Sequence, residues 1–343
     1  MALRAELTVG AGLARGLMNF AVARGADCGA LAERSGITLE ELDDQDSRVP
    51  MGCYIALMRA AKELSGDPAI ALHYGEAIDL SEVSIAGLIM NASADMREAF
   101  VQMNRFGRLA IEVETEAGED RFRHVQRDGG LWLVDTRSDP NSFLELTEVT
   151  FARQICGLRR FLPRPFALEV HVTHAAPPYR GEYERVFGCP VVFESSWNAM
   201  RTDPTLHAHK VALQPRYVFG VLSEKAEMLV RDLDASKSTR GQVESQLVLV
   251  LHTGEAGIDK IAAQMGISRQ TLFRRLRNEN TTFEKTLDDL RRRLALHYLA
   301  GRKASVNETA YLVGFSDPAA FSRAFKRWTG ASPRTFIRRG SPL

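Results

Sequence analysis

The chain has 343 residues, of which 45% are hydrophobic and 25% are charged, and its formal net charge is +1. This composition is ordinary for a soluble globular protein of two domains and excludes a disordered chain. No apolar run approaches the roughly 20 residues that span a bilayer, and the N-terminus lacks the layout of a signal peptide, so we expect a cytoplasmic protein without a membrane partner.

The charge is divided unevenly along the chain. From Lys237 onward there are 19 Lys and Arg against 9 Asp and Glu, whereas the preceding residues carry 25 against 34. A concentrated positive domain binds polyanions because neutralising their phosphates releases counterions. We therefore expect the C-terminal third to contact nucleic acid and the acidic remainder to sense something else.

Residues 10–110 are predicted to be mainly helical. Apolar residues recur at helical spacing in four stretches, and Pro50 and Gly66 supply start and stop signals for the second. These stretches cover residues 11–24, 50–64, 84–90 and 94–110. The segment 30–38 resembles the opening of a helix-turn-helix, but the acidic residues after it would repel phosphate, so we interpret it as a packing turn.

From Ile111 the hydrophobic pattern changes to a period of two, which is typical of strands. The predicted strands cover residues 111–115, 121–126, 131–134, 166–172 and 191–193. A tight turn at 128–130 joins the second strand to the third, and an amphipathic helix is predicted over 142–160. This order predicts an α+β effector-binding domain over residues 1–213, with a mainly antiparallel sheet and an apolar cavity for a small ligand.

A helical linker is predicted over residues 214–241. Its helix begins at Gln214-Pro215-Arg216 and reaches about Asp234, and the hinge follows over 235–241. The apolar positions of this helix are Val218, Leu222, Met228 and Leu229. Either this helix or helix 142–160 is a candidate homodimer interface, and packing of the stripe within its own domain is the alternative. Residues 242–343 are predicted to form an all-α domain.

One pattern occurs twice in the all-α domain, at residues 261–268 and 309–316. Each copy is a turn of helix with Ala facing inward, then a Gly, an apolar plug (Ile267 or Phe315) and a Ser (Ser268 or Ser316) that begins the next helix. The Gly adopts the positive φ at which the chain reverses, and the small Ala lets two helices approach closely. The pattern predicts two helix-turn-helix units in tandem.

The helix after each turn is expected to bury one face and expose the other. In the first, Leu272 and Leu276 share the buried face, opposite Gln270, Arg274 and Arg277; in the second, Phe321, Ala324, Phe325 and Trp328 are buried, opposite Ala319, Arg323, Lys326 and Arg327. Arg274 and Arg323 fall at equivalent positions. A guanidinium there suits bidentate hydrogen bonding to guanine in a major groove, and a solvated basic face on an ordinary helical bundle is the alternative.

Residues 314–333 resemble the signature of the AraC/XylS family of bacterial transcription regulators, and residues 268–276 resemble that family's first recognition helix. The resemblance implies that a long helix, here 283–299, joins two units that read successive major grooves of double-stranded DNA. Carried over by position, base-edge contacts fall to Arg269, Gln270, Phe273 and Arg274, and to Ala319, Ser322 and Arg323. Ala319 replaces a polar residue often found there, so the second unit is expected to bind mainly through phosphates and a thymine methyl group.

Three further basic residues, Arg277, Lys326 and Arg327, are expected to contact DNA beside these positions. Phe273 lies next to Leu276 on the helical wheel, so a core position is its alternative. The order of the N-terminal elements resembles the effector domain of ornithine-utilisation-type regulators of the same family, not the double-stranded barrel of the arabinose sensor. The resemblance implies control by a small metabolite, such as an amino acid, an aromatic acid or a fatty acid, and activation through RNA polymerase.

Neither catalysis nor a metal or cofactor site is indicated. His171 and His174 point to opposite faces of a predicted strand, and His207 and His209 have no evident third ligand, so we expect surface or linker histidines. The cysteines are scattered and are expected to be reduced thiols: Cys28, Cys53, Cys156 and Cys189. No nucleophile elbow, phosphate loop or dinucleotide fingerprint occurs. The alternatives are an enzyme fused to an AraC-like DNA-binding module and a non-specific architectural DNA-binding protein.

Overall fold

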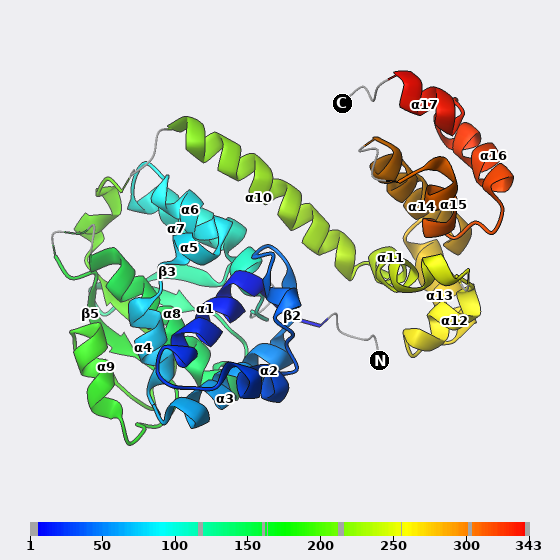
Figure 1. The fold of residues 1–343 in the computed structure, drawn as a ribbon. Helices are drawn as coiled ribbons and strands as arrows, with labels where there is room; N and C mark the ends of the chain where they lie inside the picture. Colours follow the sequence, from blue (N-terminus) through cyan, green and yellow to red (C-terminus); the bar gives the residue numbers. More distant parts are fainter. Residues whose placement is uncertain are drawn as a thin grey trace. The chain divides into compact units, whose positions relative to one another are not determined.

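The computed structural model describes residues 6–115, 119–159, 162, 164–211, 216–254, 256–300 and 304–339. The chain divides into two compact units, Met1–Val230 and Arg231–Leu343, each with its own hydrophobic core (Figure 1). The first unit combines helices with a sheet and the described part of the second is helical, which confirms the predicted fold class. Within the described ranges no helix has the length and hydropathy needed to span a membrane.

The N-terminal half of the first unit packs helices around a short two-stranded sheet. Strand β1 (Thr8–Gly10) pairs antiparallel with β2 (Arg48–Pro50). The helices are α1 (Ala11–Val22), α2 (Cys28–Ser35), η1 (Glu40–Leu42), α3 (Met51–Ser65), α4 (Ile70–Ala77), α5 (Leu80–Val83), α6 (Ile85–Asn91) and α7 (Met96–Ala110). Helices α1, α3, α6 and α7 confirm the four predicted stretches, whereas α4 and α5 were not predicted.

The segment 30–38 packs into the core of the first unit. Gly36 ends α2 with a φ of 69°, and Leu31 and Ile37 on either side of the turn are almost fully buried. A short 3-10 helix follows instead of a second full helix. The segment therefore serves as a packing turn, as its acidic continuation predicts.

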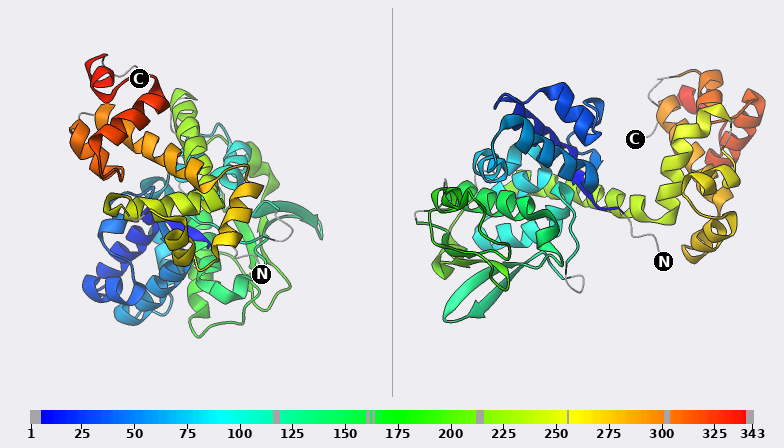
Figure 2. Two further views of the ribbon diagram at one scale, coloured as in Figure 1. Left: turned by 90° about the vertical axis from the view of Figure 1, so that its right-hand side faces the viewer. Right: turned by 90° about the horizontal axis from the view of Figure 1, so that it is seen from below.

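The second half of the first unit is built on a five-stranded sheet in the order β3-β4-β7-β5-β6. Its strands are β3 (Phe122–Arg127), β4 (Gly130–Asp135), β7 (Asn198–Thr202), β5 (Ala167–His171) and β6 (Val191–Val192). All neighbours are antiparallel except β5 and β6. Asp128 and Gly129 join β3 to β4 with φ values of 51° and 70°, the two positive values of a tight hairpin turn. Figure 2 shows this hairpin extending beyond the helices of the first unit.

Helix α8 (Leu144–Arg159) joins the two halves of the first unit. It follows η3 (Pro140–Phe143); α9 (Arg180–Phe187) lies between β5 and β6, and η4 (Pro204–Ala208) follows β7. Leu146 and Val149 pack into the helical core, and Ile155 packs into the core beneath the sheet. The apolar stripe of α8 is therefore buried within its own unit. This packing leaves the stripe unavailable as a homodimer interface. Arg160, the predicted end of this helix, lies outside the described residues.

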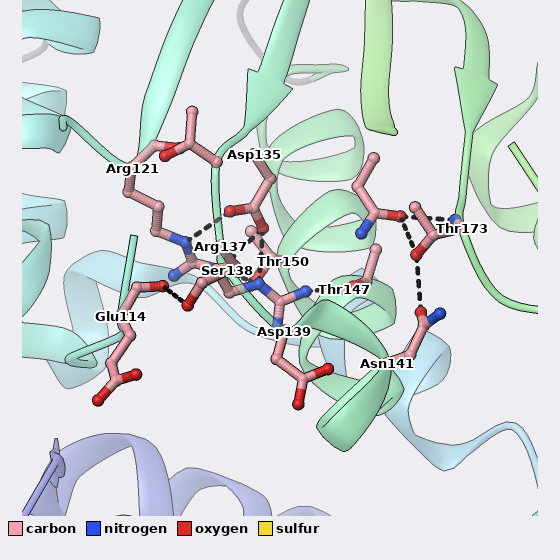
Figure 3. A network of polar contacts seen from close by, with 12 residues as sticks. Glu114, Arg121, Asp135, Arg137, Ser138, Asp139, Asn141, Thr147, Thr150 and Thr173 are labelled. Carbon is pink, nitrogen blue, oxygen red and sulfur yellow. Dashed lines mark hydrogen bonds and ion pairs between the residues drawn. The ribbon is translucent and has the colours of Figure 1, made fainter. Parts of the chain in front are cut away.

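A buried ion network fixes the end of β4 against α8 (Figure 3). The Asp135 carboxylate, with a fully enclosed side chain, accepts hydrogen bonds from Arg121 at 3.3 Å and Arg137 at 3.0 Å. Arg121 also donates to Thr150 at 3.1 Å, and Arg137 donates to Thr147. Burial opposes ionisation of Asp135, but the two guanidinium groups outweigh it and hold the pKa of this carboxyl below its usual value.

Two features of the sheet differ from the prediction. Residues 111–115 form only isolated bridges, Ile111 to Val9 and Thr115 to Arg137, so the strand predicted there is wrong. The Glu112 carboxylate turns back to accept from the backbone N–H and hydroxyl of Thr8, and no ladder continues. Strand β7 was not predicted. It is central in the sheet, and buried residues on both of its faces leave no alternating pattern.

The second unit is an array of helices that begins within a long connecting helix. Helix α10 (Arg216–Lys237) crosses the boundary between the units. It is followed by α11 (Thr239–Val250), η5 (Leu251–Thr253), α12 (Ile258–Gln264), α13 (Arg269–Asn278), α14 (Phe283–Ala300), α15 (Val306–Leu312), α16 (Pro318–Thr329) and α17 (Pro333–Arg339). Two tandem helix-turn-helix units joined by a long helix are therefore present, as predicted.

Helix α10 confirms the predicted linker helix but differs in detail. Gln214 and Pro215, at its predicted start, lie outside the described residues. The helix continues to Lys237, and Ser238 alone separates it from α11, so the break is shorter than the predicted hinge over 235–241. Ala226 and Leu233 are buried in the described part of this helix, whereas Met228, one of the predicted apolar positions, is exposed.

Candidate DNA-binding interface

Two small cores in the second unit share the long helix α14. The first core joins Leu272 and Leu276 of α13 to Phe283 and Leu290 in the first half of α14. The second joins residues of α15 and α16, including Ala310, Val313, Phe321 and Phe325, to Ala295 and Leu299 near the end of α14. Because each helix-turn-helix is packed on its own half of one helix, α14 fixes the spacing between them (Figure 1).

The first turn is set by local signals. Gly266 has a φ of 64°, and the backbone N–H of Ile267 donates to the Ala262 carbonyl at 3.0 Å. Ser268 then caps the N-terminus of α13, and its hydroxyl accepts from the backbone N–H of Thr271 at 3.1 Å. A left-handed residue followed by a helix N-cap turns the chain sharply into the second helix.

The second turn repeats this geometry with a different cap. Gly314 has a φ of 77°, and the backbone N–H of Phe315 donates to the Ala310 carbonyl at 2.9 Å. The cap of α16 is Asp317, whose carboxylate accepts from the backbone N–H groups of Ala319 and Ala320. The prediction that Ser316 begins this helix is therefore wrong by one residue, because Pro318 occupies the first helical position.

Arg291 of α14 holds the second turn in place. Its guanidinium donates to the carbonyls of Val313 and Gly314, both at 3.0 Å, and lies 4.6 Å from the ring centre of Phe315. Burial lowers the pKa of Arg291. The sequence analysis did not identify this residue, because in the run Arg291-Arg292-Arg293 nothing separates a packed arginine from an exposed one.

Helix α13 exposes all five of its predicted DNA-contacting residues: Arg269, Gln270, Phe273, Arg274 and Arg277. Phe273 is 54% exposed, which excludes the alternative of a core position. Arg269 pairs with Asp259 of α12 at 3.1 Å across the first helix-turn-helix. Arg274 makes no ion pair or hydrogen bond with another described residue, so its guanidinium is available to a ligand.

Helix α16 presents a corresponding face. Phe321, Ala324 and Phe325 are buried as predicted, and Trp328 is partly buried. Of the predicted contacts, Ala319, Arg323, Lys326 and Arg327 are exposed and Ser322 is half-buried. The Arg323 side chain is 74% exposed and lies 3.9 Å from Asp317, whereas Arg327 pairs with Asp288 of α14 at 2.8 Å. Contact between these residues and DNA remains a prediction.

The junction of α10 and α11 is held by an acidic residue that the sequence analysis missed. Glu279, just after α13, accepts from the backbone N–H groups of Thr239 at 2.7 Å and Arg240 at 3.0 Å. A carboxylate at a helix N-terminus satisfies unpaired donors and interacts favourably with the helix dipole. The first helix-turn-helix is thereby bonded to the helix that leads into it.

The titratable groups of the first unit form structural clusters. Glu148 on α8 is buried and accepts from the hydroxyls of Tyr179 at 2.9 Å and Tyr183, and burial raises the pKa of Glu148 to about 7. The Tyr183 hydroxyl also lies 3.1 Å from Nε2 of His174. The prediction of surface or linker histidines is wrong for His174, which is buried, and His207 is partly buried. The cysteines are free thiols, and within the described ranges no three His, Cys, Asp or Glu are grouped to hold a metal ion.

Comparisons with known proteins agree with both parts of this architecture. Residues 25–211 match the family described as the arabinose-binding domain of AraC transcription regulator, N-term, and residues 261–339 match a helix-turn-helix domain. The ornithine utilization regulator of Pseudomonas aeruginosa is 27% identical over 94% of each chain. The HTH-type transcriptional activator RhaS of Escherichia coli is 40% identical over 25% of this chain and 31% of its own length.

A solved structure provides a further similarity. The transcriptional regulator CdpR from Pseudomonas aeruginosa is 21% identical to this chain, with a TM-score of 0.38, over 79% of this chain and 87% of CdpR.

Proposed function

The chain belongs to the AraC family of transcription regulators, with an effector-binding domain and a DNA-binding helix-turn-helix domain, and we propose that it is a sequence-specific activator. The observation that carries this proposal is the pair of exposed arginine-bearing faces on α13 and α16, braced by one helix. Such faces suit the major groove, which displays a distinct donor and acceptor pattern for each base pair. Because its partner is duplex DNA, we expect the protein to act in the cytoplasm.

Arg274 and Arg323 are assigned direct contacts to base edges. Arg269, Gln270, Phe273, Ala319 and Ser322 lie around them on the same faces, and Arg277, Lys326 and Arg327 supply positive charge for phosphates. We assign residues 1–213 to the regulatory domain, 214–241 to the linker and 242–343 to the DNA-binding domain. Activation is supported by the name of the RhaS relative, a transcriptional activator, and we propose that it acts through RNA polymerase.

A homodimer is proposed through α10. Tyr217, Val221 and Met228 are exposed on one side of this helix, at spacings of four and seven residues. Tyr217 is 81% exposed, which is unusual for a large aromatic side chain unless another protein surface covers it. Sedimentation of the wild type and of Val221→Glu tests this assignment, since a charge on a contacting stripe should dissociate the dimer.

Selection from a random duplex library with the full chain tests sequence-specific binding. The expected product is one enriched sequence whose two contact regions lie about 10 base pairs apart, the spacing of successive major grooves on one side of a duplex. Equal retention of all sequences, undiminished by random competitor, would instead indicate an architectural protein. A thermal-shift screen of metabolites against the full chain tests control by an effector, because a ligand that binds the folded state raises its melting temperature.

A further inference from the structure

A cleft of about 460 Å³ lies in the first unit between α7, β3, β4 and η4. One face of α7 contributes Arg97, Phe100 and Arg105 to its lining, β3 contributes His124 and η4 contributes His207. This volume is within the range of roughly 300–1,000 Å³ that is usual for small-molecule sites. The cleft is therefore large enough for a small metabolite.

The polar side of the cleft carries unused positive charge and hydrogen-bonding capacity. Arg97 is exposed and makes no ion pair or hydrogen bond with another described residue. Nε2 of His207 is buried and has no hydrogen-bond partner among the described residues. Burial lowers the pKa of His207, and the positive charge of Arg97, also in the lining, lowers it further. Among the described residues of the lining, Arg97 and Arg105 are basic and only Asp120 is acidic, so the cleft favours an anion.

The other side of the cleft is apolar. The Phe100 ring lies 5.1 Å from the His124 ring and 5.8 Å from Phe166, measured between centres. Phe122 and Leu133, both in the lining, are 7% and 1% exposed. A ligand that fills this space therefore needs an apolar body as well as an anionic group.

One residue of the cleft also contacts the helix that leads to the second unit. Arg105 forms an ion pair with Glu227 of α10, and both residues belong to the first unit. Helix α10 continues past Val230 to Lys237, into the second unit. A ligand carboxylate at Arg105 would compete with the Glu227 carboxylate for the same guanidinium, since both bind it through charge-assisted hydrogen bonds.

We propose that this cleft binds a small carboxylate with an apolar body, held by Arg97 and Arg105, and that the ligand displaces Glu227 from Arg105 and so releases α10. This inference rests on the proposed control by an effector. It names the cleft as the effector's binding site and α10 as the element through which binding acts. The ligand binds one state of the α10 contact better than the other, and this preference shifts the population of the two states.

Matched pairs of probes test the carboxylate requirement in the full chain. Hexanoate, benzoate and 2-naphthoate are titrated by calorimetry beside their neutral amides, which have almost the same shape. At least one acid is expected to bind about tenfold tighter than its amide, or about 1.4 kcal/mol. Arg97→Gln should remove that preference and leave amide binding unchanged, whereas Arg59→Gln, the same change at an exposed position on α3, should have no effect.

Glu227→Gln tests the displacement step. Because this variant removes the internal competitor of the ligand, the preferred acid should bind it about threefold tighter than the wild type, which is the scale of an exposed ion pair. The cleft proposal is overturned if no acid binds better than its amide, or if Arg97→Gln and Arg59→Gln behave alike. An unchanged affinity in Glu227→Gln overturns the displacement step.

The metabolite screen separates this inference from the proposed function. A metabolite that stabilises the wild type and Arg97→Gln equally would leave control by an effector intact and place its site elsewhere. The absence of any stabilising metabolite for the wild type would contradict control by an effector itself. Either result leaves sequence-specific DNA binding to its own selection experiment.

Discussion

Alanine at the two equivalent turn glycines provides a matched test of the second unit's packing. Gly266 and Gly314 have φ values of 64° and 77°, so an added Cβ meets nearly the same backbone strain at both, roughly 1–2 kcal/mol. Their surroundings differ. A Cβ at Gly266 would have no neighbour within 4 Å, whereas at Gly314 it would lie 2.5 Å from the Leu251 carbonyl oxygen.

The close approach at Gly314 sets the expected difference between the two variants. Backbone or neighbouring groups must shift to admit an atom at that distance, and overpacking of this kind typically costs about 1–3 kcal/mol. Gly266→Ala should therefore lower the free energy of unfolding of its unit by about 1–2 kcal/mol, and Gly314→Ala by about 2–5 kcal/mol.

Hydrogen exchange read by mass spectrometry measures this difference in the full chain. Peptides from α15 and α16 should exchange faster in Gly314→Ala, and peptides from α12 and α13 should show the smaller change in Gly266→Ala. Equal acceleration in the two variants would refute the contact between Gly314 and Leu251. A Gly314→Ala protein as stable as the wild type would refute the positive-φ turn as well.

Three other predictions concern pH, salt and the second turn. Burial raises the pKa of Glu148 from 4.5 to about 7, so the stability that its protonated form provides is complete below pH 4.5 and is lost as the pH rises through 7. The advantage of the wild type over Glu148→Gln in unfolding free energy, from urea titrations, should shrink by about 3 kcal/mol across that window; a constant difference would contradict the buried carboxylate. Lys326→Ala should weaken binding to specific and random duplex alike and lower the slope of log K against log salt by about one, and a change confined to the specific site would contradict its phosphate role. Arg291→Met removes two hydrogen bonds to carbonyls and should destabilise α15 and α16 by about 1–3 kcal/mol in exchange experiments; unchanged exchange there would show that α14 does not hold the turn.

The helix-turn-helix units could be predicted closely because local chemistry determines them. A glycine at positive φ, a polar cap and a helical period together specify which side chains face the core, as Leu272 and Phe321 illustrate. The cap of α16 was misassigned to Ser316 because both Ser316 and Asp317 are good caps, and Pro318 decides between them. Exposure of Arg274 and Arg323 followed from the helical period alone.

The remaining differences arise from long-range packing. Alternation over 111–115 predicted a strand, but a strand needs a neighbouring strand that pairs with several of its residues. Here the pairing is limited to isolated bridges, and Thr8 donates from its backbone N–H and its hydroxyl to the Glu112 carboxylate. Strand β7 has no alternation because both of its faces are covered. The carbonyl that accepts from Arg291 and the aromatic ring beside His207 lie on other elements. No spacing in the sequence indicates those contacts.

Affinities of Arg274→Ala and Arg323→Ala for the selected duplex, measured by fluorescence anisotropy at one salt concentration, test the regulator assignment most directly. Each variant should bind about 1–3 kcal/mol more weakly than the wild type and lose discrimination at one guanine, in two different grooves. Arg59→Ala, exposed on α3, should bind as the wild type does. Wild-type affinity and base preference in both α13 and α16 variants would mean that these helices do not read DNA.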